Sequence, residues 1–372
     1  ALGAAAVAGL MALAPAPAHA QSLADALIAA YSNNPTLAAR RARLRATDEQ
    51  VPQALSNWRP SVSITADAGY NRNRSTLRTS DRTQNRNPAS AGVSVTQPLY
   101  RGGRTLAATE GAENSVRAER ARLIDTEQDI LLAAATAYLN VFRDEAVLDL
   151  NINNEKVLKR QLEATKDRFE VGEITRTDVH QAEARLAGAT ADRIRAEASL
   201  ENSRANYENI VGLPAPKGLK LPADPEGLPK DRHDAITQAA TNNPNVVAAE
   251  FDRKAGQNTV REVKGELLPQ VDLTGSVDRA YESSRAYQSS TDSGRIDSAE
   301  VMVNLTIPLY QQGDVYSRLR EAKQSLAELI RNIDQARRDA VEDATSAWEN
   351  LQTARARVVS FRSQIEANVV AL

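Results

Sequence analysis

The stretch Gln97-Pro98-Leu99-Tyr100-Arg101-Gly102-Gly103 occurs a second time, in altered form, as Ile307-Pro308-Leu309-Tyr310-Gln311-Gln312-Gly313. Each copy closes a run of alternating apolar residues and precedes a long helical pattern. Asn33-Asn34-Pro35 likewise recurs as Asn242-Asn243-Pro244, at nearly the same separation. Similarity at a fixed separation identifies an internal duplication. The chain is therefore expected to contain two halves with one order of elements.

The boundaries of these halves follow from a break in composition. Residues 212–231 hold five prolines and three glycines and are predicted to be a linker. The first structural repeat then covers residues 21–211 and the second covers residues 232–372. Leu372 corresponds to Leu162 of the first half, so we expect the second repeat to be truncated at its C-terminal end.

The first twenty residues form a separate segment. They are apolar and small and end in Ala18-His19-Ala20, which is typical of a secretory signal peptide. The basic start of such a peptide is missing, so residues 1–20 are predicted to be a front-truncated signal peptide. No later apolar run reaches the 18 residues of a spanning helix, so we expect an exported protein without a helical membrane anchor.

The composition excludes several classes of site. Lys plus Arg number 46 against 48 Asp plus Glu, which gives no basic excess for nucleic acid. Cysteine is absent, so disulfides and thiolate chemistry are excluded. His180 and His233 are interpreted as isolated surface residues, and no catalytic motif is found. We therefore expect no catalytic, cofactor or metal site, and a protein that is not an enzyme.

Long helices are predicted from apolar residues spaced by seven. The chain contains 63 alanines and only 4% aromatic residues, which suits helices packed through small side chains. Strict heptads indicate coiled-coil packing. The expected helices are residues 36–58, 104–170 and 175–211, and one 67-residue helix has room beside two shorter ones stacked end to end. At 1.5 Å per residue the long helix spans about 100 Å.

Between the helices the apolar period changes to two, which predicts β-strands. We expect two β-hairpins, joined by long polar loops at residues 71–90 and 282–298. Four prolines are predicted to mark the junctions between strand and helix. Proline has no backbone N–H, so it interrupts the hydrogen bonds of a helix and of a sheet. The strands are expected at about residues 61–70, 91–100, 271–281 and 299–310, and the junction prolines are Pro60, Pro98, Pro269 and Pro308.

Each strand has about the ten residues that cross a bilayer at a tilt. Alternation alone is equally compatible with ordinary soluble hairpins packed on helices. The predicted signal peptide favours membrane strands instead. Four strands are too few to close a barrel, and an open edge is not tolerated in lipid. A membrane barrel would therefore need several copies of the chain.

The duplicated motifs, together with the turn Arg168-Phe-Glu-Val-Gly-Glu-Ile-Thr-Arg-Thr-Asp-Val179, resemble the TolC family of outer-membrane channels over the whole chain from Gln21. The resemblance implies a mainly α fold with membrane β: duplicated long coiled-coil helices and two β-hairpins. It also implies a homotrimer, with four strands per chain in a 12-stranded outer-membrane barrel above a periplasmic α-helical tunnel. The acidic entrance ring of the family would lie in the missing C-terminal helix, so no residue is assigned to it.

The resemblance further implies function and partners. We expect an exit duct of a tripartite efflux or type I secretion system, located in the outer membrane of a Gram-negative bacterium with a long periplasmic extension. Its expected partners are a periplasmic adaptor, an inner-membrane ABC or proton-driven pump and outer-membrane lipid. The motifs lean slightly toward type I secretion. The alternatives are a periplasmic adaptor or coiled-coil structural protein, and a secreted enzyme.

The same resemblance assigns roles to the turn between the two long helices. It implies that the adaptor docks at this tip, and that Asp178 holds the tunnel entrance closed. The alternative is a purely structural role, in which the turn is a tight helical hairpin with Gly172 as C-cap and a threonine as N-cap. The predicted docking residues are Val171, Gly172, Thr175, Arg176 and Thr177. The arginines of the first polar loop, Arg72, Arg74, Arg78, Arg82 and Arg86, are interpreted as solvated and extracellular, not as a nucleic-acid site.

Overall fold

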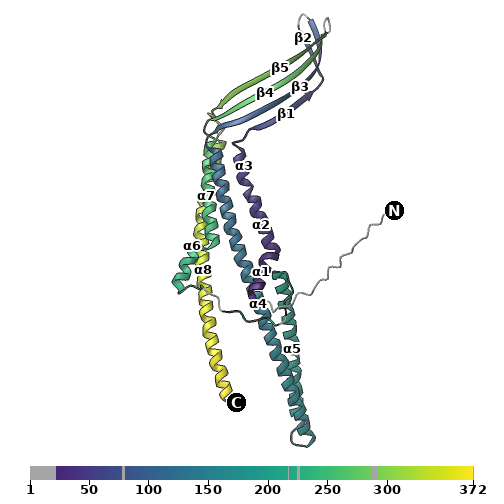
Figure 1. Cartoon of the computed structure of the whole chain (residues 1–372), viewed down its shortest axis with the longest axis vertical. Coiled ribbons are helices and arrows are strands. Elements are labelled where there is room, and N and C mark those ends of the chain that lie inside the picture. The colour runs from purple at the N-terminus through teal and green to yellow at the C-terminus, as the bar shows by residue number, and fades with distance from the viewer. Residues whose placement is uncertain (1–21, 78–79, 217, 224–226, 287–290, 372) are drawn as a thin grey trace, which may run out of the picture. The chain divides into compact units, whose positions relative to one another are not determined.

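The computed structural model describes residues 22–77, 80–216, 218–223, 227–286 and 291–371. The predicted signal peptide, residues 1–20, and Arg78 of the first polar loop lie outside these residues. In the described chain, no helix is both long and apolar enough to cross a membrane. The helices and strands (Figure 1) are α1 (Leu23–Asn33), α2 (Pro35–Asp48), α3 (Gln50–Ser56), β1 (Ser61–Ala68), β2 (Asn71–Leu77), β3 (Ser80–Arg101), α4 (Arg104–Glu170), α5 (Arg176–Val211), α6 (Arg232–Asn242), α7 (Pro244–Gly265), β4 (Gln270–Ala286), β5 (Thr291–Thr306) and α8 (Asp314–Ala371).

The chain divides into two compact units. One contains the residues up to 41 together with 125–228, and the other contains 42–124 with 229–372. The second unit draws on both sequence repeats, because hairpins from both halves pair in one sheet. The units therefore follow packing, whereas the predicted domain boundaries follow the duplication, and those boundaries stay a prediction.

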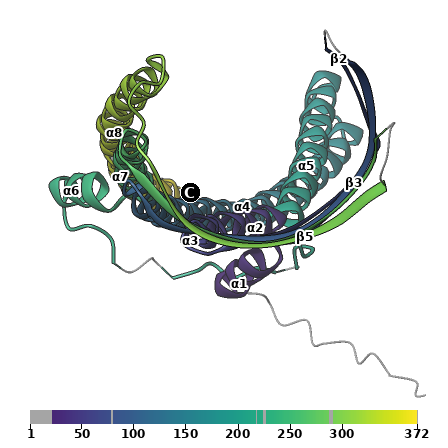
Figure 2. The ribbon, with the colours of Figure 1, turned by 90° about the horizontal axis from the view of Figure 1, so that it is seen from above.

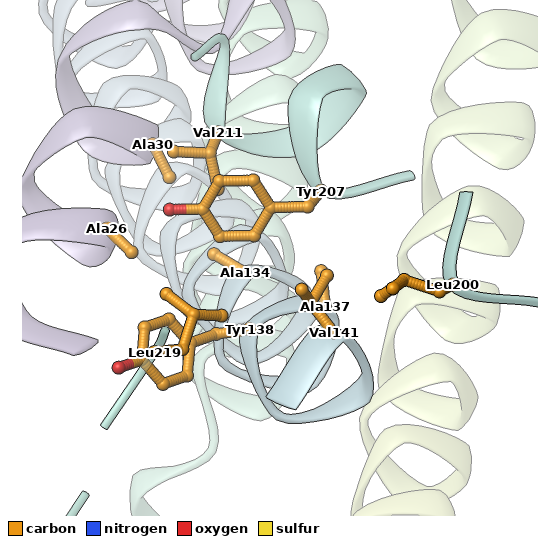
Figure 3. Packing of buried hydrophobic residues seen from close by; sticks show 10 residues of the cluster. All are labelled: Ala26, Ala30, Ala134, Ala137, Tyr138, Val141, Leu200, Tyr207, Val211 and Leu219. Carbon is orange, nitrogen blue, oxygen red and sulfur yellow. The ribbon is translucent and has the colours of Figure 1, made fainter. Parts of the chain in front are cut away.

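The first unit is held by a small core between α1, α4 and α5. Figure 3 shows Tyr138 of α4 and Tyr207 of α5, both fully buried, with Ala26 and Ala30 of α1 beside them. The Tyr138 hydroxyl donates to the Lys220 carbonyl at 2.8 Å and accepts from the Lys220 N–H at 3.2 Å. These hydrogen bonds offset the cost of removing the tyrosine hydroxyl from water. The linker is thereby attached to α4 at Lys220.

A spacing of seven along α5 connects Val179, Leu186, Leu200 and Tyr207 in one heptad row. Three of these residues are buried, and Leu186 is half-buried, so this row marks the packed side of the helix. Ala189 and Ala196 of the neighbouring row are buried as well. Small residues in this row allow two helices to approach closely, as expected from the alanine content.

The predicted bounds of the longest helix are confirmed, since α4 runs from Arg104 to Glu170. The helix predicted at residues 36–58 is wrong in detail, because it is divided into α2 and α3 at Glu49. Pro52 explains the division. It has no N–H to donate to the Asp48 carbonyl, so one helical hydrogen bond is missing at that point.

All strands in the described residues belong to one antiparallel sheet in the second unit, in the order β1-β3-β4-β5, with β2 also paired to β3. Figure 2 shows that β3 and β5 follow a bent path. β2 continues the register of β1, because Ala68 pairs with Ala89 and Asn71 pairs with Arg86. β1 and β2 are thus two parts of one hairpin leg, and the sheet has four legs.

The interruption between β1 and β2 has a local cause. The Gly69 N–H donates to the Pro88 carbonyl at 2.9 Å, as a paired residue should. Pro88 has no N–H to return the second bond of this pair, so the ladder is broken there.

The strands are longer than predicted. β3 already begins at Ser80, and β4 extends to Ala286. The polar loops expected at residues 71–90 and 282–298 are therefore largely strand. Their polar side chains lack the apolar alternation that the prediction used, whereas the backbone pairing that forms them is independent of side-chain polarity.

The repeated motif forms a turn that leads from strand to helix. Its last two residues have left-handed backbones in both halves: Gly102 (φ 62°) with Gly103 (φ 76°), and Gln312 (φ 55°) with Gly313 (φ 83°). A Cβ on Gly102 would lie 2.3 Å from the Gly265 carbonyl oxygen, whereas a Cβ on Gly103 would meet nothing within 4 Å. Gly102 is therefore required for close approach as well as for its backbone conformation.

This difference gives a matched test. Gly103→Ala should cost about 1–2 kcal/mol, the strain of a left-handed alanine. Gly102→Ala should cost clearly more, because its methyl group also collides with the backbone at Gly265. Thermal unfolding followed by circular dichroism in detergent compares the two variants with the parent. Equal losses of melting temperature would show that the contact with Gly265 is unimportant.

Candidate functional site: the hairpin tip and the two-faced sheet

The turn between α4 and α5 begins with a glycine C-cap. Gly172 has φ 81°, and its N–H donates to the Phe169 carbonyl at 3.0 Å. The Glu173 N–H donates to the Arg168 carbonyl, also at 3.0 Å. These two bonds define a Schellman motif, which satisfies the last carbonyls of the helix. The sequence prediction of a C-cap at Gly172 is confirmed.

The next helix begins at a threonine N-cap. The Asp178 carboxylate accepts hydrogen bonds from the Thr175 N–H at 2.9 Å and from the Thr175 hydroxyl at 2.7 Å. The hydroxyl hydrogen bond is the largest cause of a lowered pKa of Asp178, followed by the backbone N–H of Thr175, and the charge of Arg168 adds to it. A carboxylate in the first turn is also favoured by the helix dipole.

Two ion pairs and one histidine hydrogen bond surround this turn, and the sequence did not reveal them. Arg168 Nε lies 3.0 Å from Glu173 Oε2. Lys166 Nζ of α4 lies 3.3 Å from Glu183 Oε1 of α5, and His180 Nδ1 lies 3.1 Å from the other oxygen of that carboxylate. Hydrogen bonds from His180 and then Lys166 lower the pKa of Glu183. His180 is an exposed surface residue as predicted, but the interpretation that it is isolated was wrong, and its spacing of three from Glu183 was the available indication.

Directly above the turn, α4 and α5 enclose an open groove of about 280 Å³. It has mixed chemistry, with apolar, amide, hydroxyl and charged side chains. Asp178 lies at its lower end, so the capping carboxylate is also part of the groove surface. The groove is lined by Leu158, Gln161, Thr165, Arg168, Ile174, Asp178, Gln181, Ala182 and Arg185.

The predicted tip residues fall into two groups. Thr175 and Asp178 are brought together in the cap, and Gly172 forms the turn. Val171, at 78% exposure, lies on the surface, as do Arg176 and Thr177. The tip thus presents an exposed apolar side chain and exposed polar side chains on a rigidly capped turn. Roles in docking and gating stay predictions.

The four junction prolines do not all occupy the predicted position. Pro60 and Pro269 directly precede β1 and β4, and Pro308 lies between β5 and α8. Pro98, however, lies inside β3, which continues to Arg101. The register with β4 shifts between Pro98 and Tyr100, which indicates a β-bulge. At a bulge the ladder is locally interrupted, so a proline without an N–H is tolerated there.

Polar side chains stabilise the junction between the sheet and the helices, and they were not identified from the sequence. Arg104 Nη2 donates to Gln270 Oε1 at 2.9 Å, which links the start of α4 to the start of β4. Arg318 of α8 donates through both terminal nitrogens to the Glu266 carboxylate. This two-point geometry fixes orientation as well as distance. Its effect is to raise the pKa of Arg318 further above its ordinary value.

The sheet has one apolar face and one polar face. Val62 and Ile64 of β1 pair with Val95 and Val93 of β3, and the same face continues on β4 and β5. Ile64 is 78% exposed, so this face has no cover in a single chain. Exposed apolar side chains of this face are Val62, Ile64, Val93, Val95, Val277, Val301, Val303 and Leu305.

The opposite face is linked by short polar contacts. Ser63 and Ser94 share a hydrogen bond of 2.7 Å between their hydroxyl oxygens. The Asn304 side-chain amide donates to the Thr274 hydroxyl at 3.0 Å. A strand pair with one apolar and one polar face suits a sheet that separates lipid from water.

The family is established by comparison of the whole chain. A model of the outer membrane efflux protein family matches residues 27–213 and 235–369. The chain belongs to this family. The efflux protein BepC of Brucella suis is 31% identical over 352 residues, which cover 95% of this chain and 74% of BepC. TolC of Vibrio cholerae is 28% identical over 360 residues, covering 94% of this chain and 80% of that protein.

Solved structures agree on the fold. The outer-membrane channel OprN shares 22% identity and a TM-score of 0.77, with 93% of this chain and 77% of OprN covered. The predicted resemblance, the predicted fold class and the location in the outer membrane of a Gram-negative bacterium are confirmed. Membership of the efflux family favours the interpretation as an export channel over the alternatives of an adaptor or a secreted enzyme.

A matched pair of substitutions tests whether the apolar face of the sheet lies in lipid. Ile64→Lys puts a charge on the apolar face and should cost about 2–4 kcal/mol in a bilayer. Thr65→Lys puts the same charge on the polar face and should cost far less. Urea unfolding in lipid vesicles measures both. Similar losses for the two variants would contradict the assignment of the faces.

The cap at Asp178 predicts a pH dependence of the tip. Because its pKa is lower in the folded protein than the unfolded value of about 3.9, the carboxylate stabilises the turn above that value. The stabilisation is lost as the pH falls through the folded pKa. Amide exchange in residues 172–178, corrected for intrinsic rates, should therefore accelerate at low pH, and Asp178→Asn should remove most of this dependence. An unchanged pH profile in Asp178→Asn would contradict the cap.

Proposed function

We propose that this efflux-family protein is the exit duct of a tripartite efflux or type I secretion system. Three copies associate, and each contributes four sheet legs to a barrel of twelve strands. The helices form a periplasmic tunnel that leads to a periplasmic adaptor and an inner-membrane ABC or proton-driven pump. The duct is passive, and the pump supplies the energy.

The observation that carries this proposal is the open sheet. In the described chain β1 and β5 each pair with a strand on one side only. An unpaired strand edge in lipid leaves backbone groups without hydrogen bonds, at several kcal/mol for each group. The smallest membrane barrels have eight strands, so four legs require further copies. The resemblance to the TolC family favours three copies.

The tip supports docking of a helical partner. Its Schellman motif and N-cap hold the turn in one conformation, so little ordering is needed when a partner binds. The exposed Val171 offers an apolar contact, and the groove above the turn offers polar groups. We propose that the adaptor contacts Val171, Gly172, Thr175, Arg176 and Thr177.

We also propose a second role for Asp178. Its carboxylate holds the Thr175 cap in a single chain and lies in the groove between α4 and α5. In the assembled tunnel, polar contacts from the same residue would help to keep the entrance closed. Asp178→Ala should then increase single-channel conductance, and an unchanged conductance would leave the residue as a cap only.

Gly172→Val tests the docking role. A β-branched residue with positive φ strains the turn and places bulk where the partner helix would approach. Export that depends on the adaptor should be abolished, while the protein still reaches the outer membrane as an oligomer. Gly188→Val is the control, because it adds the same side chain within α5, at a glycine with no neighbouring atoms.

Three outcomes would contradict the proposal. Normal export by Gly172→Val would remove the tip from the docking surface. A folded monomer in detergent, measured by native mass spectrometry on the unmodified chain, would remove the shared barrel. Loss of export in both Gly172→Val and Gly188→Val would mean that the tip has no special role.

A further inference from the structure

The apolar face of the first hairpin changes character toward the hairpin end. Along β1 and β2, this face presents Ala66 and Ala68, then Tyr70, then Arg72 and Arg74. Tyr70 is 66% exposed, and both arginines are exposed. The continuous register of β1 and β2 keeps all five residues on one face. Apolar, aromatic and basic side chains thus follow each other outward from the lipid band.

The second hairpin shows the same succession on the same face. Beyond Val277, β4 presents Arg279 and Tyr281, and the paired residues on β5 are Asp297 and Arg295. The register connects the two hairpins, because Ala91 and Ala89 of β3 lie between Ala66 and Arg279 and between Ala68 and Tyr281. We call Tyr70, Arg72, Arg74, Arg279, Tyr281, Arg295 and Asp297 the outer rim.

The charges of the outer rim are arranged around one carboxylate. Asp297 accepts from Arg279 Nε at 2.5 Å and lies 3.1 Å from Arg295 Nε. Arg279 also has a side-chain hydrogen bond with Tyr281. A guanidinium has five N–H donors, so both arginines keep donors that can reach another anion. Both side chains remain about half exposed, at 52% and 57%. With four arginines and one aspartate, the rim carries a net positive charge.

The opposite face of the same strands bears three carboxylates near the rim. Asp67 accepts from the Ser90 hydroxyl at 3.0 Å, Asp278 lies against Gly92, and Glu300 pairs in register with Ser276. These side chains alternate with the rim residues along β1, β4 and β5. On β4 and β5, Asp278 and Glu300 therefore lie on the polar face, whereas Arg279 and Arg295 lie on the rim face.

We infer that the outer rim binds the phosphate groups of lipid headgroups in the outer leaflet. The helices join the strands at the end opposite to the rim, so with the helices in the periplasm the rim lies at the level of the outer-leaflet headgroups. Tyrosine is typical of that interface, and guanidinium pairs phosphate with two hydrogen bonds. The inference rests on the proposed orientation of the duct, but not on the adaptor, the pump or the number of copies.

Phosphorylated lipid is a better occupant than a soluble anion because the rim is continuous with the apolar band. A lipid can place its acyl chains against Val277 and Val301 while its phosphate reaches the arginines. A free phosphate would be bound only by its charge attraction to the arginines, and salt screens that attraction at an exposed site. Binding should therefore require both the acyl chains and the phosphate.

Lipid binding to the purified full chain in detergent micelles tests this inference directly. The probe is a diphosphorylated glucosamine glycolipid, and the comparison probe is the same glycolipid after removal of its phosphates. Native mass spectrometry and titration should show a preference for the phosphorylated form. Loss of all four arginines, by Arg72→Gln, Arg74→Gln, Arg279→Gln and Arg295→Gln together, should weaken this binding by about tenfold or more.

Two matched variants separate binding from folding. Arg86→Gln removes a charge from the same hairpin on the polar face and should leave binding unchanged. Asp297→Asn keeps the shape of the side chain but removes the competing carboxylate, so binding should become tighter. The melting temperature of each variant is first measured and compared with that of the parent, so that only folded variants are used.

The possible results decide the question. Tighter binding by Asp297→Asn together with weaker binding after loss of the arginines supports the inference. Equal binding of phosphorylated and dephosphorylated glycolipid would overturn it, as would an effect of Arg86→Gln as large as that of the rim arginines. Competition by inorganic phosphate as effective as by the glycolipid would overturn the assignment to lipid.

Discussion

The structure depends on one constraint, which is that every backbone N–H and C=O within lipid needs a hydrogen-bond partner. The sheet meets it by continuous pairing across its four legs, from β1 through β3 and β4 to β5. The two edges remain, and in the proposed barrel they pair with the edges of other copies. Because side chains alternate along every leg, the same pairing also separates an apolar face from a polar one. Lipid contact, a polar inner surface and association of copies thus have one cause.

The second requirement is that the chain must pass from a strand of the sheet into a helix within a few residues. Two consecutive left-handed residues do this in each half of the chain. In the first half, close approach to Gly265 makes Gly102 necessary, whereas Gln312 adopts a similar backbone in the second half. Arg104 and Arg318 then fasten the new helices to Gln270 and Glu266. The polar contacts stabilise the change of direction that the turn creates.

Much of this fold could be predicted from the sequence, and the misses have physical reasons. α4 was bounded correctly, because Gly103 and the Gly172 turn are strong local indications. The division at Glu49 depends on one missing hydrogen bond of Pro52, which a heptad count does not register. The polar parts of β2 and β3 lack apolar alternation, so only tertiary pairing reveals them. At the tip, the cap was predictable from local spacing, whereas the pairing of Lys166 with Glu183 depends on how α4 packs against α5.

The central claim is that the β1 and β5 edges of different copies pair with each other. The chain has no cysteine, so engineered cysteines report on this pairing alone. Ser63→Cys on β1 can be combined with Met302→Cys or Asn304→Cys on β5, all on the polar face. Within one chain, β3 and β4 separate these strands, so the cysteines are about 14 Å apart, beyond the roughly 7 Å that a disulfide allows. Oxidation in the outer membrane should give covalent dimers and trimers for at least one combination. Exclusively monomeric protein for every combination would contradict the account.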